Sequence, residues 1–289
     1  MGKLIEFRNF SFAYRGAKEN AVEDISFCVH EGEFLSIVGP TGAGKTTLCR
    51  SMIGLIPSLF SGKQTGELEI LGKPAKSYKV EELATVIGYV HQDAESQILM
   101  TNIEKEIVFP LENLGLPRAE IKKRLEDALH LVHLEDYRNR HPFYLSGGQR
   151  QRVVLATALA MQPDILILDE ATSEIDPLGA EEIMTVTKEL NDLGKTIILI
   201  EHNMEEVAKF ADRILVLDQG RLLADDTAEK VLTDLELLDR LNIYPPEVTQ
   251  LFIKLTKAGM QFDHIPVTLE DAEALLRTYL GQRQEVGVS

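Results

Sequence analysis

The chain has 289 residues, and its hydrophobic fraction of 44% and charged fraction of 26% are typical of soluble globular proteins. Its formal net charge of −16 argues against broad binding to nucleic acid or to anionic lipid. The apolar stretches fall well short of the ~18 residues that a membrane-spanning helix needs, and residues 1–10 contain no apolar signal core, so we expect neither a transmembrane segment nor a leader.

The first part of the chain alternates apolar and polar side chains, as antiparallel strands do. This pattern covers residues 3–14 and 24–39, and the second stretch runs directly into a glycine-rich loop. A helix is expected to follow over residues 46–56. Further strands are expected at 66–72 and 84–92.

Helical spacing appears in the middle of the chain. Residues 117–134 begin with a proline and repeat apolar side chains about every 3.6 positions, which predicts a helix within an insertion. The apolar run at 164–170 is typical of a strand buried on both faces. Helices and strands then alternate from about residue 177 to 218, which indicates a parallel sheet covered by helices.

A nucleotide-binding loop follows the strand that ends near residue 38. The sequence GPTGAGKTT is a complete match to G-x-x-x-x-G-K-[ST] in the required strand–loop–helix setting. The glycines let the backbone wrap around phosphates, the lysine neutralises phosphate charge, and the threonine hydroxyl after it can ligate Mg²⁺. We assign phosphate binding to Gly39, Pro40, Thr41, Gly42, Ala43, Gly44, Lys45, Thr46 and Thr47.

Two adjacent carboxylates end the apolar strand DILILDE. Buried carboxylates are unfavourable unless they hold a cation or act on water, and ligands bind at the carboxyl ends of such strands. We therefore assign Asp169 to the Mg²⁺ shell and Glu170 to the attacking water, as general base. The alternative is an ordinary polar strand terminus.

The string LSGGQ supplies a second phosphate-binding candidate. Ser146 can cap the helix that follows, and Gly147 and Gly148 allow a phosphate to approach backbone N–H groups. A simple helix cap in a loop is the alternative. The order of phosphate loop, LSGGQ, helix and LILDE favours the functional interpretation.

These strings in this order closely resemble the ATP-binding cassette (ABC) superfamily, over residues from about 3 to 225. The resemblance implies an α/β P-loop cassette, with a mixed sheet core, an antiparallel β subdomain, a helical subdomain at about 93–160, and ATP and Mg²⁺ as cofactors. It also implies that two cassettes dimerise head to tail. Ser146, Gly147, Gly148 and Gln149 of one chain would then face the γ-phosphate held by the other.

The resemblance assigns further roles residue by residue. Tyr14 would stack on adenine, although a packed or surface tyrosine is the alternative. Gln92 would reach Mg²⁺ or water and couple the site to a membrane partner, and His202 would contact the γ-phosphate, so both join Glu170 as catalytic residues. Asp176 would lie in the loop between the two active sites. Glu174, an acidic departure in that loop, is expected to alter their communication.

Three segments resemble the ATPase subunit of energy-coupling-factor (ECF) transporters, which import vitamins and transition-metal ions. They are the region around Gln97 at 91–109, the helix entry at 111–129, and the C-terminal stretch at 245–276. Many members have Phe-Gly where this chain has Phe109-Pro110, which affects the expected local turn and coupling surface.

In that family a membrane coupling protein inserts arginine-bearing helices into a groove beside the glutamine loop. Complementary charge could come from four acidic residues, although a solvated acidic face is the alternative. These residues are Asp93, Glu95, Glu104 and Glu106.

We therefore predict a cassette at 1–234 and a small helical C-terminal domain at 235–289 that could serve dimerisation. The expected function is ATP hydrolysis for an ECF-type importer at the cytoplasmic face of the membrane. Expected partners are a second ABC chain, identical or paralogous, a membrane coupling protein and a substrate-binding membrane subunit, without nucleic acid. The alternatives are the ATPase of another ABC importer or exporter, or a soluble ABC ATPase of repair or translation.

Overall fold

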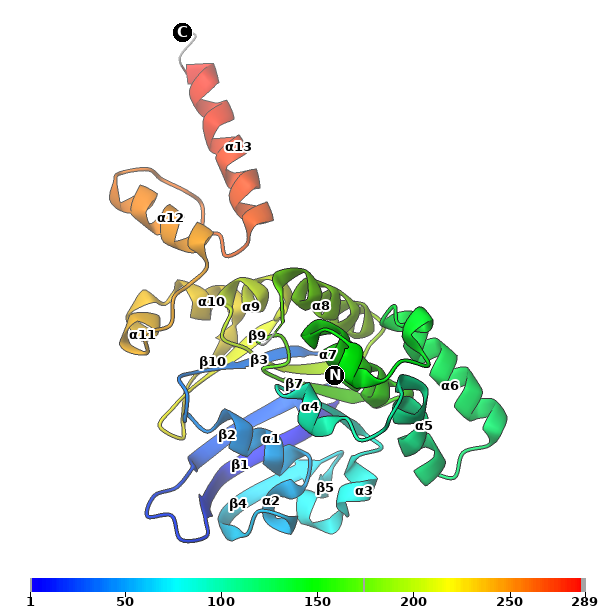
Figure 1. The fold of residues 1–289 in the computed structure, drawn as a ribbon. Coiled ribbons are helices and arrows are strands. Elements are labelled where there is room, and N and C mark those ends of the chain that lie inside the picture. Colours follow the sequence, from blue (N-terminus) through cyan, green and yellow to red (C-terminus); the bar gives the residue numbers. More distant parts are fainter. Residues whose placement is uncertain (1, 174, 287–289) are drawn as a thin grey trace.

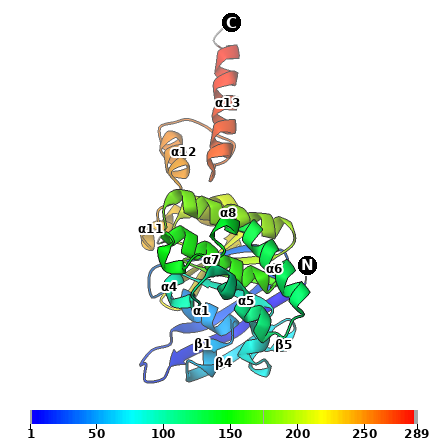
Figure 2. The same ribbon diagram turned by 45° about the vertical axis from the view of Figure 1, so that its right-hand side comes forward.

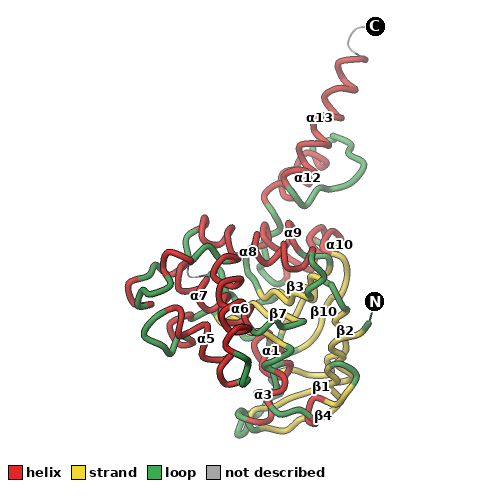
Figure 3. The backbone as a smooth tube through the Cα atoms, turned by 90° about the vertical axis from the view of Figure 1, so that its right-hand side faces the viewer, coloured by secondary structure: helices red, strands yellow, loops and turns green. Residues whose placement is uncertain are grey.

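The computed structural model describes residues 2–173 and 175–286, so the expectation about Glu174 falls outside the described residues. Two sheets and their covering helices form the body of the protein (Figure 1). The last two helices project from this body, and Figure 3 shows the same projection from the side. None of the helices in the described ranges is both long and apolar enough to span a membrane.

The smaller sheet is antiparallel and has the order β2-β1-β4-β5. The alternation seen in the sequence lets β1 bury Ile5, Phe7, Phe10 and Phe12. The expected strand at 66–72 is present but starts four residues earlier. The strands are β1 (Lys3–Tyr14), β2 (Val22–His30), β4 (Gly62–Ile70) and β5 (Lys73–Pro74).

The larger sheet has the order β10-β9-β3-β8-β7-β6 and is parallel except for the antiparallel edge strand β10. Its central strands are buried on both faces, as their apolar runs predict. The strands are β3 (Phe34–Val38), β6 (Ile87–His91), β7 (Ile165–Asp169), β8 (Thr196–Ile200), β9 (Arg213–Asp218) and β10 (Arg221–Thr227).

Helices cover the larger sheet, and Figure 2 shows α5, α6 and α7 gathered on one side. The expected helix at 46–56 is shorter because Gly54 adopts a left-handed φ of 75°. The helices are α1 (Lys45–Met52), α2 (Leu55–Ser58), α3 (Val80–Leu83), α4 (Ala94–Gln97), α5 (Ile103–Asn113), α6 (Arg118–Leu131), α7 (Gly147–Ala160), α8 (Pro177–Asp192), α9 (Met204–Phe210), α10 (Ala228–Thr233), α11 (Leu235–Arg240), α12 (Glu247–Lys257) and α13 (Leu269–Val286).

Two apolar clusters lie on opposite faces of the larger sheet. Alternate residues of β3 show the division, because Leu35 and Ile37 pack with the smaller sheet and α1, whereas Phe34 and Val38 pack under the helices. Leu241, just after α11, also belongs to the cluster under the helices. The chain beyond residue 234 therefore packs partly on the cassette, while the division into two domains remains a prediction.

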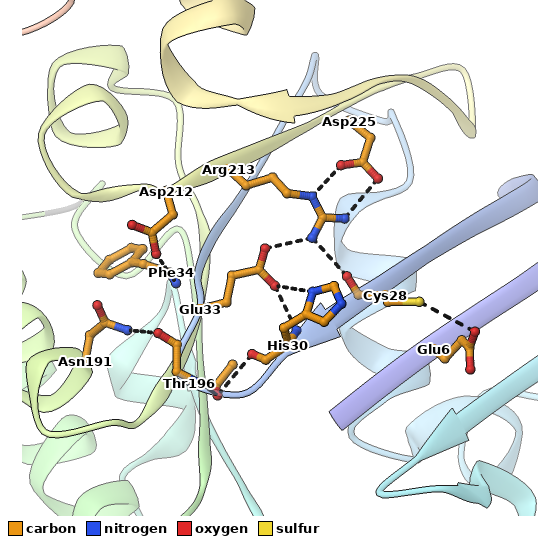
Figure 4. A network of polar contacts seen from close by, with 11 residues as sticks. Glu6, Cys28, His30, Glu33, Phe34, Asn191, Thr196, Asp212, Arg213 and Asp225 are labelled. Atoms are coloured by element: carbon orange, nitrogen blue, oxygen red, sulfur yellow. Dashed lines mark hydrogen bonds and ion pairs between the residues drawn. The ribbon is translucent and has the colours of Figure 1, made fainter. Parts of the chain in front are cut away.

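A polar network joins the two sheets (Figure 4). Arg213 on β9 donates to Glu33 at 2.7 Å and to the carbonyl oxygen of Cys28 on β2 at 3.1 Å, and it contacts both carboxylate oxygens of Asp225 on β10. The hydrogen bond with Asp225 raises the pKa of the Arg213 guanidinium. Glu33 also accepts from the backbone N–H of His30 at 2.8 Å, so this arginine fixes the orientation of one sheet on the other.

Candidate functional site

The phosphate loop links β3 to α1 through a backbone path that requires glycine. A Cβ atom added to Gly39 would lie 2.1 Å from the carbonyl oxygen of Leu217, and one added to Gly44 would lie 2.7 Å from that of Ala21. Gly42 has open space around it, but its φ of 82° favours glycine. The loop thus forms a cradle whose shape any side chain at Gly39 would disrupt.

Lys45 closes this loop at the start of α1. Its side chain is 5% exposed, and Nζ donates to the carbonyl oxygens of Gly39 at 2.7 Å and Pro40 at 3.1 Å. Burial lowers the pKa of this ammonium, while the nearby charges of Glu170 and Asp169 raise it. The cation is held by loop carbonyls, from which it can turn to phosphate oxygens.

Tyr14 lies beside α1 and is half-buried. Its hydroxyl is 3.2 Å from Oγ1 of Thr47 and accepts from Arg50 at 3.3 Å, and its ring packs edge-on against Phe12 with centroids 5.0 Å apart. The structure therefore brings Tyr14 to the loop residue Thr47. Stacking of its ring on adenine remains a prediction.

Asp169 ends β7 as a buried carboxylate, with 4% of its surface exposed. Burial raises its pKa, and a hydrogen bond from the Tyr89 hydroxyl at 2.7 Å opposes that rise. In the part of the chain that the structure describes, no three His, Cys, Asp or Glu side chains could hold a metal alone. The Mg²⁺ roles of Asp169 and Thr46 remain predictions.

The predicted base and the predicted switch histidine meet in the structure. Nε2 of His202 lies 3.0 Å from Oε1 of Glu170. Glu170 has a left-handed φ of 54°, and its N–H donates to the carbonyl oxygen of Ile200 at 2.9 Å. A non-glycine residue in this conformation is strained, and the bond to β8 helps to hold it there. The two loops after β7 and β8 therefore form one unit.

Two other glutamines fix the loop that contains Gln92. Gln97 accepts from the N–H of His91 at 2.7 Å and donates to the carbonyl oxygen of Tyr89 at 3.2 Å. Gln151 on α7 donates to the carbonyl oxygen of His91 at 2.8 Å. Gln92 itself lines an open hollow shared with Gly147. The structure thus places Gln92 next to the LSGGQ helix of its own chain.

The LSGGQ segment forms the N-terminus of α7 with a capping box. The Gln149 N–H donates to Oγ of Ser146 at 3.2 Å, and the Ser146 N–H donates to the Gln149 side chain at 3.0 Å. A Cβ atom added to Gly148 would lie 3.7 Å from Cα of Gly179, in ordinary van der Waals contact. Asp176 caps α8 by accepting from the Gly179 N–H at 3.0 Å. Its Oδ2 would lie 3.9 Å from a Cβ atom added to Gly148, so its loop borders the LSGGQ helix.

The acidic groove expected beside the glutamine loop requires one correction. Glu106 is 5% exposed, and its carboxylate accepts from the N–H groups of Leu99 at 2.9 Å and Met100 at 2.6 Å. It therefore neither faces a partner nor forms part of a solvated face. Helical position alone could not show this, because the loop before α5 folds back over the side chain.

The other three acidic residues are accessible but already have partners. Glu104 pairs with Arg138 at 2.7 Å, and Glu95 pairs with Arg150 at 2.9 Å. Asp93 caps α4 by accepting from the N–H of Glu95 at 3.0 Å. Fewer unpaired carboxylates are therefore available to an arginine-bearing partner than the sequence suggested.

Sequence reasoning missed Tyr89, Gln151 and a buried set around Thr172 and Glu201. Tyr89 interrupts an apolar strand and Gln151 lies on the buried side of a helix, whereas Thr172 and Glu201 are polar residues that closely follow apolar strands. Glu201, directly before the switch histidine, was the clearest signal among them.

Comparison with known proteins gives a consistent result. The family profile described as ABC transporter matches residues 22–173. A Pyrococcus abyssi protein named as an ABC transporter ATP-binding protein is 41% identical over 258 residues, covering 89% of this chain and 92% of that protein. The energy-coupling factor transporter ATP-binding protein EcfA2 of Methanospirillum hungatei is 39% identical, covering 90% of this chain and 65% of that protein.

Two solved structures are also similar. CbiO1 of Clostridium perfringens, described as part of the ABC transporter complex CbiONQ, has a TM-score of 0.74 at 28% identity and covers 88% of this chain and 100% of its own. The ATP-binding cassette MJ0796, solved as a dimer with ADP and Pi, has a TM-score of 0.67 at 30% identity. The match covers 78% of this chain and 99% of MJ0796. The predicted cassette fold is confirmed.

Proposed function

Because the chain belongs to the ABC transporter family of ATP-binding proteins, whose cassettes hydrolyse ATP for transport, we propose that it is the ATPase subunit of an ECF-type importer. Its transported substrate would be a vitamin or a transition-metal ion. The likeness to EcfA2 and to CbiO1 supports this branch. Many other relatives carry only the general ABC name, so the ATPase of another importer or exporter is the second candidate.

The contact between Glu170 and His202 carries the catalytic part of the proposal. Glu170 acts as general base on the attacking water, and His202 orients it and reaches the γ-phosphate. Lys45 neutralises phosphate charge from the closed end of the loop. Mg²⁺, when bound, would supply charge stabilisation at the phosphate oxygens, with Thr46, Asp169 and Gln92 as its protein contacts.

Each ATP site is proposed to be shared between two chains. The capping box of Ser146 and Gln149 presents the α7 N-terminus as an anion-binding surface, and Gly148 keeps it free of side-chain bulk. The solved dimer of the related cassette MJ0796 supports an assembly of two chains. The partner can be an identical or a paralogous cassette.

A membrane coupling protein is proposed to dock at the hollow between α3, α5 and α7. Leu55, Val80 and Ala84 line one side of this hollow, and Gln97 and Pro110 line the other. Gln97 also holds the strand that leads to Gln92, so movement at the hollow would reach the ATP site. With this partner the chain would lie peripherally on the cytoplasmic face of the membrane.

Copurification tests this proposal. Tagged protein expressed in its own host should bring down a membrane coupling protein together with a substrate-binding membrane subunit. Ala84→Arg, at the exposed rim of the hollow, should weaken that capture, whereas Ala119→Arg, on the exposed surface of α6, should not. Recovery of a different type of membrane protein would instead support another ABC importer or an exporter.

A further inference from the structure

A second connection joins the loops of Glu170 and His202 on their buried side. Thr172 lies two residues after Glu170 and is 6% exposed, and Glu201 lies one residue before His202 and is 3% exposed. The Thr172 hydroxyl donates a hydrogen bond to Oε1 of Glu201. The same two loops are therefore linked twice, once at the accessible side and once beneath it.

Glu201 also holds the backbone of the switch histidine. Its second oxygen, Oε2, accepts from the N–H of His202 at 3.1 Å. Both oxygens of this buried carboxylate are thus engaged, one with each loop. A buried charge needs such partners, and removing one leaves the carboxylate poorly compensated.

Glu206 on α9 is partly buried and lies next to Thr172. Its Oε2 lies 3.4 Å from the Thr172 hydroxyl oxygen, and its Oε1 accepts from the Asn203 side chain at 3.3 Å. A hydroxyl has one proton, so Thr172 cannot donate to both carboxylates. Burial and the charge of Glu201 raise the pKa of Glu206.

We propose that Glu201 is a positioning residue for ATP hydrolysis, which holds His202 against Glu170 by accepting hydrogen bonds from Thr172 and from the His202 backbone. Its carboxylate is 3% exposed and already occupied, so it acts through its neighbours rather than on the substrate. The inference rests on the proposed roles of Glu170 and His202. It adds a residue that sets their separation.

Paired substitutions at Thr172 test the inference. Thr172→Val removes the hydroxyl at nearly constant volume, and Thr172→Ser retains it. Misplacement of catalytic groups by about 1 Å can lower turnover by ~10²-fold, so we expect Thr172→Val to lower kcat by about 10- to 100-fold. KM for ATP should change little, because the phosphate loop is untouched. Thr172→Ser should keep most of the activity.

Introducing Thr172→Val into a His202→Ala chain distinguishes a role in positioning His202 from a general effect on the structure. If Glu201 acts through His202, Thr172→Val should lower kcat no further once the imidazole is absent. The Gln side chain of Glu201→Gln has only one oxygen and cannot accept from both loops at once. This variant should likewise lower kcat only when His202 is present, and it provides the test if the Thr172→Val chain fails to fold.

Three outcomes would overturn the inference. One is an equal fall in kcat in both backgrounds, and another is a loss in Thr172→Ser as large as in Thr172→Val. The third is unchanged turnover in His202→Ala, which would remove His202 from hydrolysis. Each of these leaves ATPase activity and membrane partners of the unmodified chain in place, so failure here differs from failure of the proposed function.

Discussion

The hydroxyl of Tyr89 on β6 donates a 2.7 Å hydrogen bond to Oδ2 of Asp169 at the end of the neighbouring strand β7. Asp169 is 4% exposed, and burial raises its pKa. One hydrogen bond offsets only part of the lost hydration of a carboxylate. In the absence of nucleotide, this proposed Mg²⁺ ligand is therefore a source of instability.

Asp169→Asn should stabilise the nucleotide-free protein while it abolishes ATP hydrolysis. The folded-state pKa of Asp169 lies above its unfolded value, so ionisation at neutral pH favours unfolding; this unfavourable contribution decreases as pH falls below the folded pKa and vanishes below the unfolded pKa. We expect a gain on the order of 1 kcal/mol in the free energy of unfolding at pH 7, the usual size of a single-residue effect. Urea unfolding at several pH values would measure it.

The parent and the Asp169→Asn variant should then converge in stability as the pH is lowered, because Asp169 of the parent becomes neutral. The amide oxygen of the substituted side chain can still accept from the Tyr89 hydroxyl, so that bond does not confound the comparison. A variant that is less stable than the parent throughout the pH range would contradict the assignment of Asp169 as a destabilising charge.

Glu170→Gln should retain ATP affinity and nearly abolish turnover. Removing a general base typically lowers the rate by ~10²–10⁴-fold, and the amide can still contact His202. ATP should therefore accumulate in a closed dimer, which gel filtration with ATP would detect. Glu181→Gln, at a side chain that is 65% exposed on α8, provides a control that should hydrolyse ATP normally. Near-normal hydrolysis by Glu170→Gln would exclude Glu170 as the base.

Mixing two inactive chains tests whether the ATP site is shared. A Lys45→Ala chain lacks phosphate binding, and a Ser146→Arg chain lacks a usable LSGGQ surface. If the chain homodimerises, the mixed dimer regains one intact site, from the phosphate loop of the Ser146→Arg chain and LSGGQ of the Lys45→Ala chain. Activity above that of either parent would support sharing. Proven mixed dimers without recovered hydrolysis would count against independent shared sites.

Local motifs explain why much of the fold and of the phosphate loop could be predicted. The glycine pattern of the phosphate loop is readable from neighbouring residues, and the structure shows the expected strand, loop and helix, although the close approach that Gly39 permits is to the distant Leu217. The contact between Glu170 and His202 is different, because parallel strands β7 and β8 bring together residues distant in sequence. The family resemblance placed His202 near the γ-phosphate, and its contact with Glu170 was not predicted.

Features that depend on how loops fold back were not predictable. Glu106 looks like any exposed acid on an amphipathic helix, yet the chain before α5 turns two N–H groups onto it. The resemblance singled out Gln97, but it did not predict the two hydrogen bonds that Gln97 makes with the backbone of β6, because these depend on how α4 folds against that strand. The Thr172–Glu201 bond requires knowing that both side chains point inward.

The C-terminal helices combine a specific attachment with exposed apolar side chains. The N–H of Glu247, the first residue of α12, donates to the Glu205 carboxylate on α9 at 2.6 Å. Within this unit, Phe252 is fully buried and its ring lies 4.6 Å from that of Phe262. Leu251 and Leu269 nevertheless remain 47% and 68% exposed. We predict that these helices contact a second copy of the chain.

Truncation after Tyr244 should therefore weaken dimers that form without ATP and leave nucleotide binding intact. This end point keeps α10, α11 and Leu241, which pack into the cassette core, so the shortened chain should fold. Sedimentation of both chains without nucleotide would measure the change, and ATP binding would confirm folding. Leu251→Lys in the full chain is a smaller change that should also weaken dimerisation without nucleotide. Lys257→Glu at the end of α12 should leave dimerisation unchanged. Unchanged dimerisation of a folded truncation would show that these helices serve another purpose.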